Sequence, residues 1–141
     1  MDLADIDDIY GNQILEHGRN PQNRERLLTP DVTGRATNPF CGDEVDIQIL
    51  FEDSRVSAVG IQAVGCSINQ AAASILSGLI LGMSANEVIS TSNRFREVMT
   101  SNISQDELRD SGDLIALVGV KKHPIRIKCA LLSFSALEET L

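Results

Sequence analysis

The clearest alternation of apolar and polar residues lies between positions 44 and 64. Every second residue from Val45 to Phe51 is apolar, which is the period of a strand with one buried face. A second run of mostly β-branched and small apolar residues covers 56–64, and the sequence EDSR at 52–55 separates the two runs. Together these segments predict an antiparallel hairpin with one solvated face.

The segments on either side of the hairpin follow other periods. Residues 5–17 carry apolar residues at helical spacing, and Gly18 is a typical helix C-terminal residue. Residues 31–38 predict a short edge strand. After the hairpin, alanine and leucine replace valine, which predicts a long helix that begins at 66–67 and has Gly82 just past its end.

The C-terminal half predicts further helices. Two Ser-x-x-Glu sequences, at 84–87 and 104–107, match the capping box and predict two short helices. Residues 112–119 form a short apolar turn or helix. Pro124 precedes a last helix over 126–139, with an apolar side.

A sheet followed by helices predicts an α+β fold, a small three-stranded antiparallel sheet with helices, including a C-terminal one, packed on one face. The length of 141 residues suits one domain over 1–141. The net charge of −8 argues against a nucleic-acid partner. The acidic N-terminus does not resemble a signal peptide, and the longest apolar stretch is shorter than the roughly 20 residues that span a bilayer. We therefore expect a cytoplasmic protein that is not bound to membranes.

The three cysteines are expected at the boundaries of elements. Their odd number and wide spacing argue against a disulfide framework. Cys41 falls in the turn before the first strong strand, and Cys66 and Cys129 fall in the first turns of two predicted helices. Unpaired N–H groups at a helix N-terminus stabilise a thiolate, and Arg126 and Lys128 add positive charge beside Cys129.

Three thiolates need a fourth ligand to complete a tetrahedral zinc site, and Asp43 can supply it. Only Gly42 separates Asp43 from Cys41, so both side chains can converge on one ion. No Cys-x-x-Cys pair is present, and the spacing alone fits a metal site or three buried structural cysteines equally well. We interpret His17 as a solvated or capping residue and His123 as a loop residue, rather than as ligands.

Four segments of the sequence resemble a known family. They are EHGRNPQN, NPFCGDEVDI, GCSINQAAASIL and HPIRIKCALLSFSAL, and they resemble, in order, the IscU/NifU-N/SufU family of iron–sulfur cluster assembly proteins. Lys128 stands where IscU-type scaffolds have a histidine ligand. Residues 93–111 form a segment that is longer than in those scaffolds. The sequence VGVKKHP stands in place of the Leu-Pro-Pro-Val-Lys that IscU scaffolds offer to their chaperone. These features are similar to the SufU branch. Phe134, where many relatives have tryptophan, is a conservative core change.

The resemblance implies a SufE/NifU-like fold and a zinc-bound sulfur acceptor. It implies Cys41, Asp43, Cys66 and Cys129 as zinc ligands, with Cys41 also carrying the persulfide, and it matches Arg126 to the arginine near the family's site. The implied partner is a PLP-dependent cysteine desulfurase of the SufS type. In this family the desulfurase supplies a competing ligand that releases the carrier cysteine. The sulfur would then pass to a downstream iron–sulfur scaffold or apo-protein.

Two other functions stay open. The same cysteines could bind iron or an Fe–S cluster in a scaffold that passes the cluster on, although Lys128 counts against it because lysine is a poor ligand at neutral pH. The ion could instead be structural, and the domain an interaction module. The protein would pass on a persulfide like a sulfurtransferase and stimulate the desulfurase. It is also open whether it is an enzyme in its own right.

Overall fold

The computed structural model of the chain describes residues 12–40, 42–101, 103–108 and 111–141. Three strands form one antiparallel sheet in the order β1-β2-β3. The helices are of α type, except for two 3₁₀ helices between α4 and α5. In chain order the elements are α2 (Asn12–Arg19), β1 (Val32–Asn38), β2 (Asp43–Glu52), β3 (Arg55–Val64), α3 (Ser67–Leu79), α4 (Ala85–Thr100), η2 (Gln105–Leu108), η3 (Gly112–Lys122) and α5 (Pro124–Glu138).

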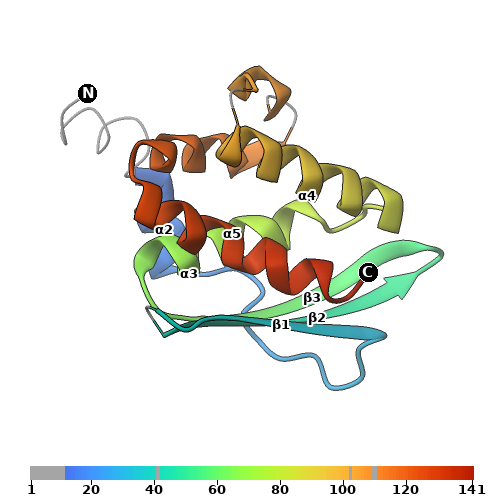
Figure 1. The fold of residues 1–141 in the computed structure, drawn as a ribbon. Coiled ribbons are helices and arrows are strands. Elements are labelled where there is room, and N and C mark those ends of the chain that lie inside the picture. Colours follow the sequence, from blue (N-terminus) through green and yellow to red (C-terminus); the bar gives the residue numbers. More distant parts are fainter. Residues whose placement is uncertain (1–11, 41, 102, 109–110) are drawn as a thin grey trace.

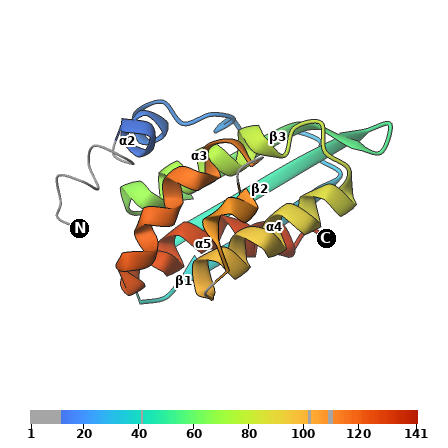
Figure 2. The same ribbon diagram turned by 90° about the horizontal axis from the view of Figure 1, so that it is seen from above.

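The labelled helices cover one face of the sheet, as Figures 1 and 2 show. Helix α3 packs on β3, and α5 packs on β1 and β2. Helix α4 and η3 contact α5 and form the layer farther from the sheet (Figure 1). The predicted α+β architecture, with its three-stranded antiparallel sheet and C-terminal helix, is confirmed.

The apolar face of the hairpin forms the base of the core. Val45, Ile47 and Ile49 are fully buried beneath the helices. Gly34 of β1 pairs with Ile47, and a Cβ atom at position 34 would overlap the backbone carbonyl of Ala136. The glycine therefore lets the end of α5 lie directly on the edge strand.

The turn between β2 and β3 has two residues. Glu52 pairs with Arg55, and Asp53 and Ser54 both have positive φ angles, 53° and 66°. Two central residues with positive φ are the signature of a type I′ turn, whose twist matches that of the flanking strands. The prediction of a turn at 52–55 is confirmed.

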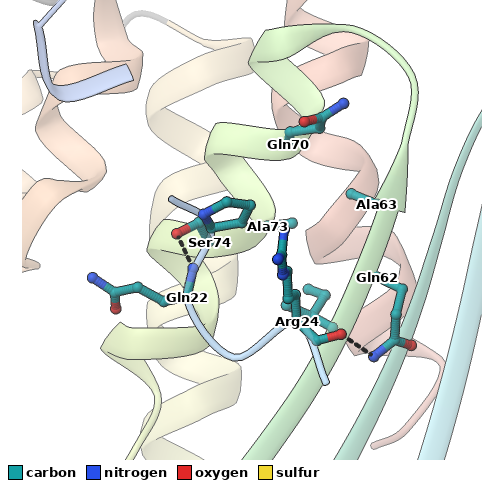
Figure 3. Close-up of a pocket in the computed structure, with 9 residues that line it drawn as sticks. Gln22, Arg24, Gln62, Ala63, Gln70, Ala73 and Ser74 are labelled. Carbon is teal, nitrogen blue, oxygen red and sulfur yellow. Dashed lines mark hydrogen bonds between the residues drawn. The ribbon is translucent and has the colours of Figure 1, made fainter. Parts of the chain in front are cut away.

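The predicted solvated face of the hairpin is wrong around Gln48, which is only 1% exposed. The segment 20–31 lies over this region of the sheet. The backbone N–H of Ile61 donates to the carbonyl of Asn23 at 2.8 Å, and Gln62 Nε2 donates to the carbonyl of Arg24 at 3.1 Å (Figure 3). The alternation in the strand does not predict this burial, because the segment that covers Gln48 is a polar loop distant in the sequence.

The two capping boxes gave different outcomes. Ser84 accepts a hydrogen bond from the Glu87 N–H at 3.2 Å, and the helix it begins is 16 residues long rather than short. At the second box only η2, a single turn, forms. The longer segment expected at 93–111 therefore consists of the second half of α4, η2 and the residues around them, part of which lies outside the described residues.

Three other helix boundaries refine the predictions. Gly18 lies inside α2, which continues to Arg19, so it does not end the helix as predicted. Most of the predicted helix at 5–17 lies outside the described residues. Gly82 follows the end of α3 with a φ of +84°, as predicted. Pro124 is the first residue of α5, where its missing N–H costs no helical hydrogen bond.

Aromatic packing joins the last helix to the outer layer. The rings of Phe95 in α4 and Phe134 in α5 stack with their centroids 4.5 Å apart, and both side chains are fully buried. The interpretation of Phe134 as a core residue is confirmed. No helix in the described part of the chain is long and apolar enough to cross a membrane.

Candidate metal centre

Three of the predicted ligands meet at one end of the sheet. Asp43 is the first residue of β2, Cys66 is the N-cap of α3, and Cys129 lies on α5. One carboxylate oxygen and the two sulfur atoms all lie within 4.8 Å of one another. Cys41, the fourth predicted ligand, lies outside the described residues.

The position of Cys66 follows from the way α3 begins. Its backbone is extended, with φ −69° and ψ 164°, as is usual for an N-cap residue. Among the described residues its side chain makes no capping hydrogen bond, unlike Ser84 at the start of α4. The sulfur instead lies close to Asp43 and Cys129. The predicted boundary position of Cys66 is confirmed.

The prediction for Cys129 is wrong in one respect. Because α5 begins at Pro124, two residues before the predicted start, Cys129 lies in the second turn of the helix rather than the first. The effect of helix N–H groups on a thiolate falls off within the first turn. Any stabilisation of a Cys129 thiolate must therefore come mainly from neighbouring charges, of which Arg126 is one.

The carboxylate of Asp43 is enclosed by the protein. The residue is 3% exposed, and its Oδ2 atom has no hydrogen-bond partner among the described residues. A buried carboxylate oxygen without a partner is unfavourable unless a cation or donor reaches it. A thiol, thiol and carboxylate donor set is one that zinc accepts, so these residues fit a bound metal ion.

Two glycines shape the surroundings of Asp43. Gly42 has a φ of +75°, and its N–H donates to the carbonyl of Asn38 at 2.8 Å, which closes the connection from β1. The expectation that Gly42 takes an unusual backbone angle is confirmed. Gly65 has a φ of +137°, and a Cβ atom there would overlap the carboxylate of Asp43. The absence of a side chain at position 65 thus leaves room for Asp43 beside Cys66.

The positively charged guanidinium of Arg126 lies beside the two thiols. Its pKa is raised above the ordinary value, first by coulombic attraction to Cys66, then by hydrogen bonds to Cys66 and Cys129. The guanidinium stays protonated at every physiological pH and can offset the negative charge of thiolates. The family resemblance predicts an arginine near the site at this position.

The pocket that contains these groups has a volume of about 440 Å³. Its rim includes two strongly exposed apolar side chains, Phe40 at 90% and Ile125 at 84%. Lys128 is also exposed, and its Nζ atom lies 5.6 Å from the centroid of the Phe40 ring, in a cation–π contact. The described residues lining the pocket are Asn38, Phe40, Asp43, Cys66, Pro124, Ile125, Arg126, Lys128 and Cys129.

The interpretation of His17 as solvated or capping is wrong. The residue is 8% exposed, and its two ring nitrogens lie 2.7 Å from Ser74 Oγ and 2.9 Å from Asp113 Oδ2. It therefore joins α2 to α3 and η3 and lies outside the metal-binding group. His123 is exposed at the N-cap of α5 and also stands outside that group.

The fold and the site define a class of protein. It is an α+β domain whose strand β2 and helices α3 and α5 bring a carboxylate and two thiols together at one end of the sheet. Residues 9–130 match the family described as the NifU-like N terminal domain. The chain belongs to this family, as the resemblance of its cysteine segments predicted.

Curated relatives align along most of the chain. The zinc-dependent sulfurtransferase SufU of Bacillus subtilis is 35% identical over 136 residues, which cover 96% of this chain and 91% of the relative. The iron–sulfur cluster assembly scaffold protein IscU of Streptococcus pyogenes is 28% identical over 143 residues, which cover 100% of this chain and 87% of the relative.

Solved structures share the fold. A structure from Fervidobacterium islandicum, titled a putative iron–sulfur cluster assembly scaffold protein for the SUF system, superposes with a TM-score of 0.84 at 25% identity, covering 95% of this chain and 97% of the other. The N-terminal part of a NifU-like protein from Brucella abortus superposes with a TM-score of 0.82 at 23% identity, covering 96% and 93%. The second likeness concerns the fold alone.

Proposed function

We propose that this chain is a zinc-dependent sulfur acceptor, one domain over 1–141, that takes sulfur from a PLP-dependent cysteine desulfurase of the SufS type. Asp43, Cys66, Cys129 and Cys41 would hold the ion, and Cys41 would carry the sulfur as a persulfide. The observation that carries this proposal is that ligand atoms of Asp43, Cys66 and Cys129 lie within 4.8 Å of one another. The Oδ2 atom of Asp43 is also buried without a hydrogen-bond partner among the described residues.

Bound zinc would keep the cysteines as thiolates at neutral pH. The Cys41 thiolate attacks the outer sulfur of the persulfide on the desulfurase. The sulfur–sulfur bond of that persulfide breaks, and the desulfurase cysteine leaves as a thiolate. Cys41 gains the outer sulfur, so the exchange involves no net oxidation or reduction.

The surrounding residues have separate tasks in this proposal. The fixed charge of Arg126 offsets the negative charge that the thiolates of Cys66 and Cys129 bring to the pocket. Asp43 and Cys66 are held by the sheet and by the start of α3, so they keep their place while sulfur is exchanged. The apolar rim at Phe40 and Ile125 offers a surface on which the desulfurase can dock next to Cys41.

The relatives support the partners that we assign. The SufU relative is named a zinc-dependent sulfurtransferase, and its alignment spans nearly all of both chains. We accordingly propose that the sulfur passes to an iron–sulfur scaffold or an apo-protein, and that the exchange takes place in the cytoplasm.

A scaffold that carries an Fe–S cluster is the second candidate, because other relatives are named as scaffolds. The same two thiols could bind iron. Lys128 argues against this candidate: it lines the pocket and contacts the ring of Phe40, but a lysine is a poor metal ligand at neutral pH. Transfer of a reconstituted cluster to an apo-protein, without stimulation of a desulfurase, would favour the scaffold.

The proposal is tested by measuring sulfide or alanine production by a SufS-type desulfurase with and without the protein. Wild type should stimulate turnover, and Cys41→Ala and Asp43→Ala should not. Glu52→Ala, which removes an exposed carboxylate from the other end of β2, is the matched control and should stimulate like wild type. Failure of wild type to stimulate, with zinc bound in stoichiometric amount, would reject the sulfur-acceptor function.

A further inference from the structure

Two side-chain amides hold the turn that carries Cys66. Asn69 Nδ2 donates to the carbonyl of Val64 at 3.1 Å, and Gln70 Nε2 donates to the carbonyl of Gly65 at 3.0 Å. Both amides belong to the first turn of α3, and both reach back to the residues before it. Figure 3 shows Gln70 on α3, close to the link from β3.

The backbone of this turn is intrinsically mobile. Gly65 has a φ of +137°, an angle that other residues rarely adopt, and glycine loses more conformational freedom on folding than any other residue. The hydrogen bonds to the carbonyls of Val64 and Gly65 restrict the link on both sides of the Gly65 α-carbon. The link in turn fixes where the Cys66 sulfur lies relative to β2.

Asn69 is an unfavourable residue for a purely apolar core. The residue is fully buried, and its Oδ1 atom has no hydrogen-bond partner among the described residues. An apolar side chain would fill the same space without leaving a buried acceptor unsatisfied. The bond that Asn69 does make is the one to the carbonyl beside Gly65.

We infer that Asn69 and Gln70 are positioning residues for the metal centre: by bonding the carbonyls of Val64 and Gly65, they hold Cys66 in register with Asp43 for a bound cation. The described hydrogen bond of each amide nitrogen goes to a backbone carbonyl and not to a candidate ligand. Outer hydrogen bonds of this kind orient metal ligands, and their loss typically lowers metal affinity by about 10–100-fold. The inference rests on the proposed function only in taking zinc as the ion.

The inference is tested by measuring zinc affinity in competition with a chelator, for wild type, Gln70→Met and Gln70→Glu. Gln70→Met removes the donor and keeps the shape, and we expect its zinc affinity to fall by about 10-fold. Gln70→Glu also removes the donor and adds a negative charge, which by itself would favour a cation. A fall in both variants therefore reports lost position rather than changed charge.

Two further readouts separate positioning from stability. The thiolate-to-cobalt absorption of the Co²⁺-loaded protein should change in Gln70→Met, while the unfolding temperature of the metal-free chain should stay close to that of wild type. Gln22→Met, which removes an exposed amide near the same helix, is the matched control and should leave affinity and absorption unchanged. Asn69→Asp should weaken zinc binding in the same way as the Gln70 variants.

The outcomes distinguish this inference from the proposed function. Unchanged zinc affinity and cobalt absorption in both Gln70 variants would overturn the positioning role, whatever the desulfurase assay shows. Weakened zinc binding in those variants, together with a wild type that binds zinc without stimulating a desulfurase, would support positioning and reject the sulfur-acceptor function. A wild type that binds no zinc would overturn both.

Discussion

The α-carbon of Gly65 lies against the carboxylate of Asp43, so closely that a Cβ atom on residue 65 would overlap it. This contact ties the start of α3 to the start of β2. The two candidate ligands Asp43 and Cys66 can therefore lie close together only because residue 65 has no side chain.

Gly65→Ala should disrupt the metal centre. The new methyl group would displace Asp43, and an L-residue at a φ of +137° adds strain of about 1–3 kcal/mol. We expect zinc affinity to fall by at least about 10-fold. Gly82→Ala is the matched control, because Gly82 also has a positive φ, +84°, but has open space around it. It should lower stability and leave zinc affinity unchanged, and equal zinc affinity in the two variants would contradict the prediction.

Arg126→Gln should separate metal binding from sulfur exchange. Arg126 interacts with both described thiols through its charge and hydrogen bonds but is exposed and offers no ligand atom. We expect the zinc content to stay stoichiometric while stimulation of the desulfurase falls by about 10-fold. Arg126→Lys should recover only part of it, because an ammonium lacks the forked donor geometry. Arg24→Gln, at another exposed arginine, should have no effect, and full stimulation by Arg126→Gln would rule out this role.

His17→Ala should destabilise the chain without changing the metal centre. The variant leaves Ser74 and Asp113 without their shared partner and opens a gap between α2 and α3. We expect the free energy of unfolding to fall by about 1–3 kcal/mol in urea titrations. His123→Ala, at the exposed second histidine, should change it by less than about 0.5 kcal/mol. A similar loss in both variants would show that the buried contacts of His17 contribute nothing specific.

Glu87 should make stability depend on pH in the acid range. A hydrogen bond from Arg55, and then one from Ser84, lower the pKa of Glu87 below its ordinary value of 4.5. The folded chain therefore binds this proton less readily than the unfolded chain, so the contribution is present above the unfolded pKa and is lost as pH falls through the folded pKa.

The measurement is the difference in unfolding free energy between wild type and Glu87→Gln, taken at neutral pH and again below the lowered pKa. The difference should shrink in acid. A Glu87→Gln difference that stays constant from neutral to acid pH would contradict the prediction.

Local patterns were enough to predict the hairpin and to single out candidate metal ligands. The alternation from Val45 to Phe51 and the polar turn at 52–55 specify a hairpin, because the strand period and the turn chemistry are both local. The boundary position of Cys66 also followed from local signals, since the change from valine to alanine marks the start of α3. The length of α4 was not predicted. The helix continues through polar residues to Thr100 because it packs against α5.

The sequence by itself determined the strands, the family and the set of chemical groups that could bind a metal, since each depends on residue types at short spacing. Only the tertiary structure decided which groups meet. It brought Asp43, Cys66 and Cys129 together from three elements, covered Gln48 with a distant loop and buried His17 between Ser74 and Asp113. Contacts between residues far apart in the chain depend on how whole elements pack, and no local pattern encodes them.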